Sequence, residues 1–112
     1  MKTPKLPQWE QELAQCRQQL SQLGCLSAGS VVQRRRGQSG SPYRWTRKVA
    51  GKTVTVSLSK AQYHWLKQAI ANHRTARSIL NRMEQLSRRI LFATVPGVVH
   101  RKPLKDKVLG LK

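Results

Sequence analysis

Acidic side chains are scarce in this sequence. Its 112 residues include 22 Lys and Arg but only four Asp and Glu, which gives a formal net charge of +18 at pH 7. Side-chain catalysis needs paired carboxylates, a nucleophile with its base, or a metal-binding cluster. Glu10 and Glu12 are two positions apart and point to different sides of a helix. Because Glu84 and Asp106 are isolated, the sequence encodes no nuclease or transposase site, and we expect a protein that is not an enzyme.

Metal-ligand and cofactor patterns are missing too. Cys16 and Cys25 do not form a Cys-x-x-Cys pair, and in a reducing compartment such thiols are more often small core residues than a disulfide. His64 and His100 have no acidic or cysteine partner at metal spacing. His73 is expected to pack within an apolar helix face. No Gly-rich loop followed by Lys-Ser or Lys-Thr is present, so we predict no metal and no cofactor.

Long apolar runs are also absent. No stretch approaches 18 apolar residues, and neither a lipidation motif nor a signal-peptide core follows the first residues. A membrane surface is the main rival to nucleic acid as a polyanionic partner. These absences favour a soluble cytoplasmic protein that binds nucleic acid.

The best-defined pattern runs from residue 43 to residue 92. Residues 43–49 and 53–58 are rich in β-branched and aromatic side chains and are separated by a Gly-containing loop, residues 50–52, which predicts a β-hairpin. Ser59 and Gln62 match a capping box, so a helix is expected to begin at Lys60 and to run to residue 92. Val54, Val56 and Leu58 share one face of their strand, and this helix is expected to cover it.

The remaining segments complete an α+β fold. Residues 1–7 form a lead-in, residues 8–24 an amphipathic helix, residues 29–92 a nucleic-acid-binding module, and residues 93–112 a basic tail that is disordered when free. Within the module, residues 30–36 are a first strand and residues 37–42 a flexible loop, so the three strands form an antiparallel meander. The second half of the long helix packs against the N-terminal helix or against another copy of the chain.

Positive charge is concentrated on the predicted sheet. Residues 29–59 contain seven basic residues and no acid, and further basic residues recur along one stripe of the long helix. Phosphate contact is therefore favoured over plain solvation of these charges. Trp45 is expected either to fill the core beneath the helix or, with Tyr43, to stack against a base or sugar. The candidate nucleic-acid-binding residues are Arg34, Arg35, Arg36, Arg44, Thr46, Arg47, Lys48, Lys52, Thr53, Thr55, Lys60, Lys67 and Arg74.

A family resemblance covers residues 26–91. The Gly-Ser-Val-Val at residues 29–32, the Gly-Lys-Thr hairpin at residues 51–53 and the helix with Asn72 and Arg74 resemble an uncharacterised family of small basic bacterial and archaeal proteins, a domain of unknown function. Some of its members carry transposase-like labels. The family usually has a small cysteine cluster before its aromatic strand, but residues 37–42 contain no Cys, so no metal knuckle is implied here.

The order of three strands and a helix is also similar to the arm-binding domain of tyrosine recombinases. In that module a Gly-Ser, a Trp-containing strand, a Gly-Lys turn and a helix beginning at Lys-Ala recur, and the sheet face enters the DNA major groove. The similarity implies that the following residues lie toward DNA: Arg34, Arg36, Arg44, Thr46, Lys48, Thr53 and Thr55.

The sequence therefore predicts a non-enzymatic nucleic-acid-binding protein, with duplex DNA favoured over RNA and a role as accessory or regulator of a mobile element. RNA binding stays open, because Arg-rich strands also bind A-form backbones. The alternative from another class is a helical assembly or scaffold protein of a larger nucleoprotein complex, which self-associates or binds a partner protein through its helical seams.

Overall fold

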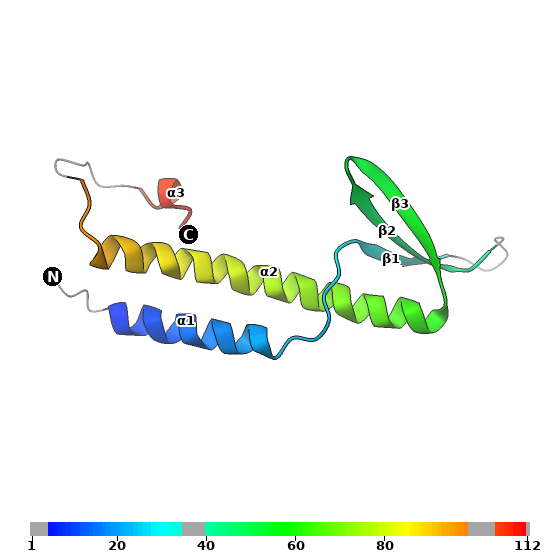
Figure 1. Ribbon diagram of the computed structural model, residues 1–112, viewed down its shortest axis with the longest axis horizontal. Coiled ribbons are helices and arrows are strands. Elements are labelled where there is room, and N and C mark those ends of the chain that lie inside the picture. The colour runs from blue at the N-terminus through cyan, green and yellow to red at the C-terminus, as the bar shows by residue number, and fades with distance from the viewer. Residues whose placement is uncertain (1–4, 35–39, 99–104, 112) are drawn as a thin grey trace. The chain divides into compact units, whose positions relative to one another are not determined.

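The computed structural model describes residues 5–34, 40–98 and 105–111, and it confirms the predicted α+β class (Figure 1). The helices and strands occur in this order: α1 (Leu6–Ser21), β1 (Ser30–Gln33), β2 (Tyr43–Val49), β3 (Lys52–Leu58), α2 (Lys60–Thr94) and α3 (Asp106–Leu109). The chain divides into two compact units. Unit 1 comprises Met1–Gln22 with Arg77–Lys112, and unit 2 comprises Leu23–Ala76.

The sheet of unit 2 is the predicted antiparallel meander, with strand order β1-β2-β3. Its hairpin turn is tighter than expected, because Lys52 pairs with Val49 and belongs to β3. Ala50 and Gly51 form the two-residue turn with φ values of 50° and 81°. Positive φ at both positions is typical of the type I′ turn, whose twist matches that of the strands. The predicted three-residue loop was therefore one residue too long.

Helix α2 begins where the capping box predicts. The Gln62 amide donates to Ser59 Oγ at 3.1 Å, and the Ser59 amide donates to Gln62 Oε1 at 2.9 Å. Each side chain thus accepts from the other residue's backbone, which satisfies amides that have no partner within the helix. The helix starts at Lys60 as predicted and ends at Thr94, two residues later than expected.

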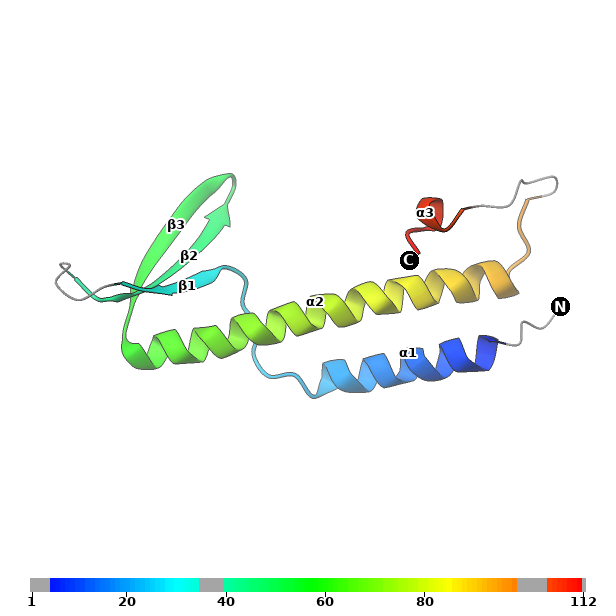
Figure 2. The ribbon, with the colours of Figure 1, turned by 180° about the vertical axis from the view of Figure 1, so that it is seen from behind.

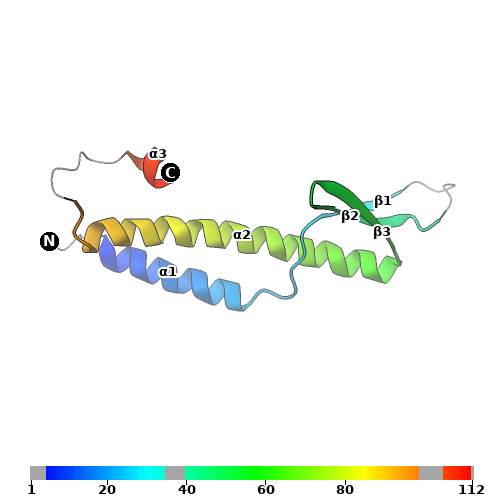
Figure 3. The same ribbon diagram turned by 45° about the horizontal axis from the view of Figure 1, so that its top comes forward.

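Unit 1 is built on a pair of antiparallel helices. Helix α1 runs beside the second half of α2, as all three ribbon views show (Figures 1, 2 and 3). It begins at Leu6, two residues before the predicted start, and ends at Ser21, three residues before the predicted end. Cys16 and Leu86 are buried in this unit. The apolar face of α1 is therefore used within the chain, which confirms the first of the two partners predicted for α2.

The connector between α1 and the sheet is fastened to the first half of α2. Asn72 Nδ2 donates to the carbonyl of Cys25 at 3.1 Å, and the Ser27 amide donates to the carbonyl of Ala69 at 3.2 Å. These bonds fix the entry of the chain into β1. Cys25 is exposed on this connector, whereas Cys16 is buried, so the prediction of a core thiol was wrong for Cys25 and right for Cys16.

Helix α2 covers only part of the apolar sheet face. Leu58, Ala69 and Ile70 are buried, whereas Val54 and Val56 remain 38% and 40% exposed. Figure 1 shows the tip of the hairpin rising away from α2. Two-stranded ribbons twist strongly and a helix is straight, so the two can stay in contact only near one end. The expectation that the helix covers the whole face was wrong for these two valines.

The ends of two predicted segments also differ from expectation. Strand β1 stops at Gln33 instead of residue 36. Residues 35–39 and 99–104 lie outside the described part of the chain, and with them part of the predicted loop and basic tail. Within the tail, Asp106–Leu109 form one helical turn, which ends at Gly110 in the left-handed conformation. A fully irregular tail was therefore not the right description of these four residues.

An ion pair across unit 1 gives a first testable prediction. Arg82 Nη2 donates to Glu12 Oε1 at 2.9 Å, and Arg82 Nε donates to Glu12 Oε2. This hydrogen bonding, helped by charge attraction and opposed by desolvation, holds the pKa of Glu12 below its ordinary value of 4.5. Both side chains are about two-fifths exposed, so Glu12→Gln is expected to lower the free energy of unfolding by at most about 1 kcal/mol.

The pH dependence of this effect has a defined sign. A lowered folded-state pKa contributes stability above the unfolded pKa of about 4.5, and this contribution disappears as the pH falls through the folded-state value. Urea unfolding should therefore show a difference between wild type and Glu12→Gln near neutral pH that vanishes in acid. Glu10→Gln, on an exposed site of the same helix, is the control. A difference that persists in acid would contradict this account.

Candidate nucleic-acid interface

The strand register places five of the candidate residues on one side of the sheet. Arg44 lies opposite Val32 and Ser57, Thr46 opposite Ser30 and Thr55, and Lys48 opposite Thr53. Directly paired residues of an antiparallel sheet project to the same face. We call this side, away from buried Leu58, the outer face. Its candidate residues are Arg44, Thr46, Lys48, Thr53 and Thr55.

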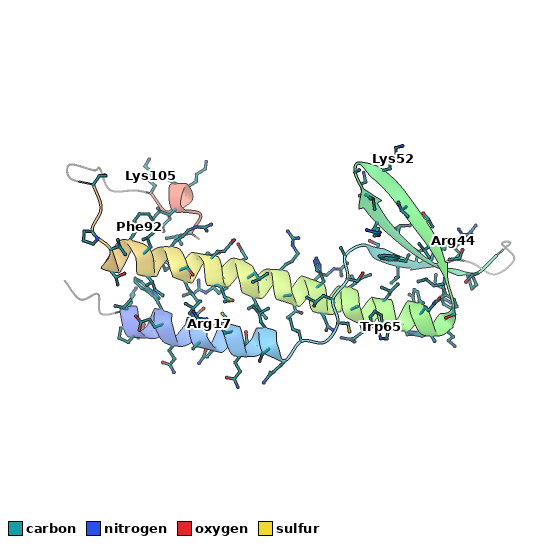
Figure 4. The ribbon with its side chains drawn as sticks, viewed as in Figure 1. Arg17, Arg44, Lys52, Trp65, Phe92 and Lys105 are labelled. Atoms are coloured by element: carbon teal, nitrogen blue, oxygen red, sulfur yellow. The ribbon has the colours of Figure 1, made fainter. Side chains whose placement is uncertain are left out.

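The outer face is open to solvent and rich in hydrogen-bonding groups. Lys48, Thr53 and Thr55 are exposed, and Arg44 and Thr46 are half-buried. Arg44 Nε is buried and, among the described residues, has no hydrogen-bond partner. Its guanidinium lies beside Gly40, near one end of the sheet, as labelled in Figure 4. The Nε donor of Arg44 is therefore not used by a hydrogen bond among the described residues.

Two candidate residues of the hairpin lie on the opposite side, which we call the inner face. Arg47 pairs with Val54, and Lys52 pairs with Val49 at the hairpin tip (Figure 4). The inner face also carries Trp45, which pairs with Val56. The guanidinium carbon of Arg47 lies 5.2 Å from the centroid of the Trp45 ring, within cation–π range. Hairpin charge is thus divided between two faces and does not form one surface.

The arginine run after β1 is only partly described. Arg34 follows β1, is half-buried, and donates its amide to the carbonyl of Pro42 at 2.6 Å. This bond continues the pairing between β1 and the segment before β2. Arg35 and Arg36 lie outside the described residues.

The basic residues of α2 form two groups, one on each half of the helix, with different surroundings. Lys60, Lys67 and Arg74 are exposed on the first half of α2, and Lys67 and Arg74 line a hollow of about 260 Å³ together with Ser30 and Val31. On the second half, three arginines have contacts within unit 1. Arg82 pairs with Glu12, Arg88 lies against Gly110, and Arg89 lies 6.0 Å from the ring centroid of Trp9. The candidate helix residues therefore belong to unit 2.

The division into units places all four acids in unit 1. Unit 2 carries ten of the 22 Lys and Arg residues and none of the four acids. In unit 1, by contrast, Glu12 already neutralises Arg82. The positive charge of unit 2 thus has no carboxylate of its own unit to pair with, and this favours an external polyanion.

One feature escaped the sequence analysis. Trp65 on α2 is 57% exposed and lines a hollow of about 330 Å³ with Trp45, Val56, Leu58, Gln62 and Leu66. The available signal was its position, because Trp65 lies beside the helix face formed by Leu66, Ala69, His73 and Ala76 and is not part of it. A tryptophan outside the seam of a small domain indicates an exposed aromatic surface.

Trp45 fills part of the core, which is one of the two roles that the sequence left open, and stacking against a base or sugar stays a prediction. Its ring lies on the inner face and is half-buried, and its Nε1 donates to the carbonyl of Ala28 at 3.0 Å. The polar end of the indole is thus satisfied inside the fold. Part of its surface nonetheless lines the open hollow opposite α2.

Within the part of the chain that the structure describes, no group of three or more His, Cys, Asp or Glu residues could hold a metal ion. None of the described helices is both long enough and apolar enough to cross a membrane. Comparisons with protein-family models, with curated proteins and with solved structures found no match to this chain.

Proposed function

We propose that this protein is a non-enzymatic nucleic-acid-binding module that binds duplex DNA through the outer face of its sheet. The observation that carries the proposal is the register, which gathers Arg44, Lys48 and three threonines on one exposed face of a unit without acids. Arginine and lysine neutralise phosphates, and threonine hydroxyls donate to phosphates or to base edges. The B-form major groove is wide enough to admit a two-stranded β-ribbon.

Duplex RNA is the less suitable ligand for this surface. The major groove of A-form RNA is deep and narrow, so side chains of a sheet do not reach its base edges. Lys60, Lys67 and Arg74 add positive charge to the same unit, which supports phosphate binding in general. The preference for DNA therefore rests on the sheet and not on the net charge.

The helical-assembly alternative loses much of its basis. It requires the apolar seams of the two helices to face other chains. Helix α1 instead packs with the second half of α2 in unit 1, where Cys16 and Leu86 are buried. A role with a mobile element rests on the family resemblance alone.

Fluorescence anisotropy over a salt series tests the proposal. Labelled duplex DNA, duplex RNA and single strands of equal length are titrated with the full chain. We expect duplex DNA to bind more tightly than duplex RNA at physiological salt, with a logarithmic salt slope set by the number of phosphates neutralised. Equal affinity for all ligands that collapses as salt rises would contradict the sheet-in-groove proposal.

A further inference from the structure

The hollow between β3 and α2 is an open aromatic site on the inner face of unit 2, which we call the indole hollow. Trp45 and Val56 contribute from the sheet, and Trp65 and Leu66 contribute from the helix. Its volume of about 330 Å³ is within the range of small-ligand sites. Because Val54 and Val56 are left exposed where the hairpin leaves α2, the hollow is open to solvent.

A basic side chain, that of Arg47, lies next to this apolar site through its contact with Trp45. Arg47 is exposed and lies against the Trp45 ring. No acid occurs in unit 2, so Arg47 has no carboxylate within its own unit with which to pair. A ligand that matches both features carries a flat apolar ring and an anionic group close to it.

We propose that the indole hollow binds an unpaired base of a nucleic acid, with the adjoining phosphate on Arg47. The ligand class rests on the proposed function, but the site is separate from the outer face. Indoles stack on any base, and a basic side chain beside them follows the backbone, which is how single strands are bound without sequence preference. Gln62 Nε2 adds a hydrogen-bond donor at the rim, because Oε1 of this residue is held by the Ser59 amide.

Other occupants match the site less well. A second copy would bring another chain of charge +18 against a unit that already lacks acids. An apolar side chain of a partner protein would fill the hollow, but it would leave Arg47 without an anion. An unpaired nucleotide satisfies the two indoles and the guanidinium together.

Tryptophan fluorescence measures occupancy directly, because bases that stack on an indole quench its emission. A Trp9→Phe background leaves only Trp45 and Trp65 as emitters. We expect a short oligothymidine and a duplex with one unpaired thymidine to quench this emission. The same duplex with every base paired should quench it less. The Trp65→Leu variant removes one stacking contact, so it should bind the oligothymidine about tenfold more weakly than the background protein.

Arg47→Gln supplies the second variant, and Arg17→Gln is its matched control. Arg17 is exposed on α1, and its replacement removes the same charge (Figure 4). Arg47→Gln should lower the logarithmic salt slope for the single strand by about 0.7, the value of one phosphate contact. Arg17→Gln should leave that slope unchanged. Circular dichroism establishes that each variant is folded.

The outcomes separate this inference from the proposed function. Single-strand affinity that is unchanged in Trp65→Leu, or equal losses in Arg47→Gln and Arg17→Gln, would overturn the indole hollow as a base site. Tryptophan emission that is quenched only by an apolar peptide, and not by any oligonucleotide, would overturn the base site as well. Duplex affinity in Trp65→Leu is expected to stay within about twofold of wild type, whereas failure of the outer face would show in substitutions at Arg44 and Lys48.

Discussion

A double variant with Arg44→Gln and Lys48→Gln is expected to bind duplex DNA at least about tenfold more weakly than wild type at physiological salt. Both side chains lie on the outer face, two strand repeats apart and therefore on the same side of β2. Each phosphate contact contributes about 0.9 to the logarithmic salt slope, so removing two should lower it by about 2. Anisotropy over a salt series measures the affinity and the slope together.

A matched control separates position from charge. Arg17→Gln with Lys105→Gln removes the same two charges from exposed sites of unit 1 (Figure 4). Its affinity should fall only slightly, and less at high salt, because distant charges act through screened attraction. Equal losses in the two double variants would show that the net charge of +18, and not the outer face, determines binding.

Gly29→Ala is expected to destabilise the sheet by about 3 kcal/mol. Gly29 has a φ of 103°, which disfavours any residue with a Cβ, and an alanine Cβ would lie 2.5 Å from the carbonyl oxygen of Thr46. The same Cβ would lie 2.6 Å from Trp45 Nε1. Neither atom can move freely, since Thr46 lies in β2 and Trp45 Nε1 donates to Ala28.

Two glycine controls separate the two causes of this destabilisation, which are the backbone strain of a positive φ and the steric clash of the Cβ. Gly51 has a φ of 81°, but a Cβ there meets nothing within 4 Å. Gly51→Ala should therefore cost only the backbone strain, about 1 kcal/mol. At Gly24 the nearest atom is Asn72 Nδ2 at 3.4 Å, so Gly24→Ala should have a small effect. Urea unfolding ranks the three variants, and a cost at Gly29 equal to that at Gly51 would contradict the steric account.

The position of Gly29 also links the stability of the sheet to both proposed sites. It holds the start of β1 against Thr46, whose side chain is on the outer face, and against Trp45, which lines the indole hollow. A substitution that disturbs these contacts less than Gly29→Ala is therefore expected to weaken ligand binding at the outer face and at the indole hollow together. The substitutions at Arg44 and Trp65 should separate them.

Much of the candidate site follows from the two-residue alternation of β-strands. Applied to β2, it places Trp45 and Arg47 on one face and Arg44 and Lys48 on the other. Arg47 entered the predicted interface on charge alone, although the alternation already indicated the opposite side. The basic character of the site was thus easier to predict than the division of its basic residues between two faces of the sheet.

The sequence by itself determined the local structure. The β-branched strands, the turn at Gly51 and the reciprocal bonds of Ser59 and Gln62 depend on residues close together in the chain, so their patterns predict them. The lack of acids from residue 13 to residue 83 likewise follows from the sequence alone.

Only the tertiary structure decided which surfaces are closed and which stay open. Glu12 meets Arg82 across 70 residues, and Asn72 meets Cys25 across 47. The twist of the hairpin leaves Val56 of β3 exposed, although α2 was expected to cover that strand, and Trp65 of α2 is exposed as well. These outcomes depend on how packed elements fit in three dimensions, and periodicity within one element carries no information about the angle at which it meets another.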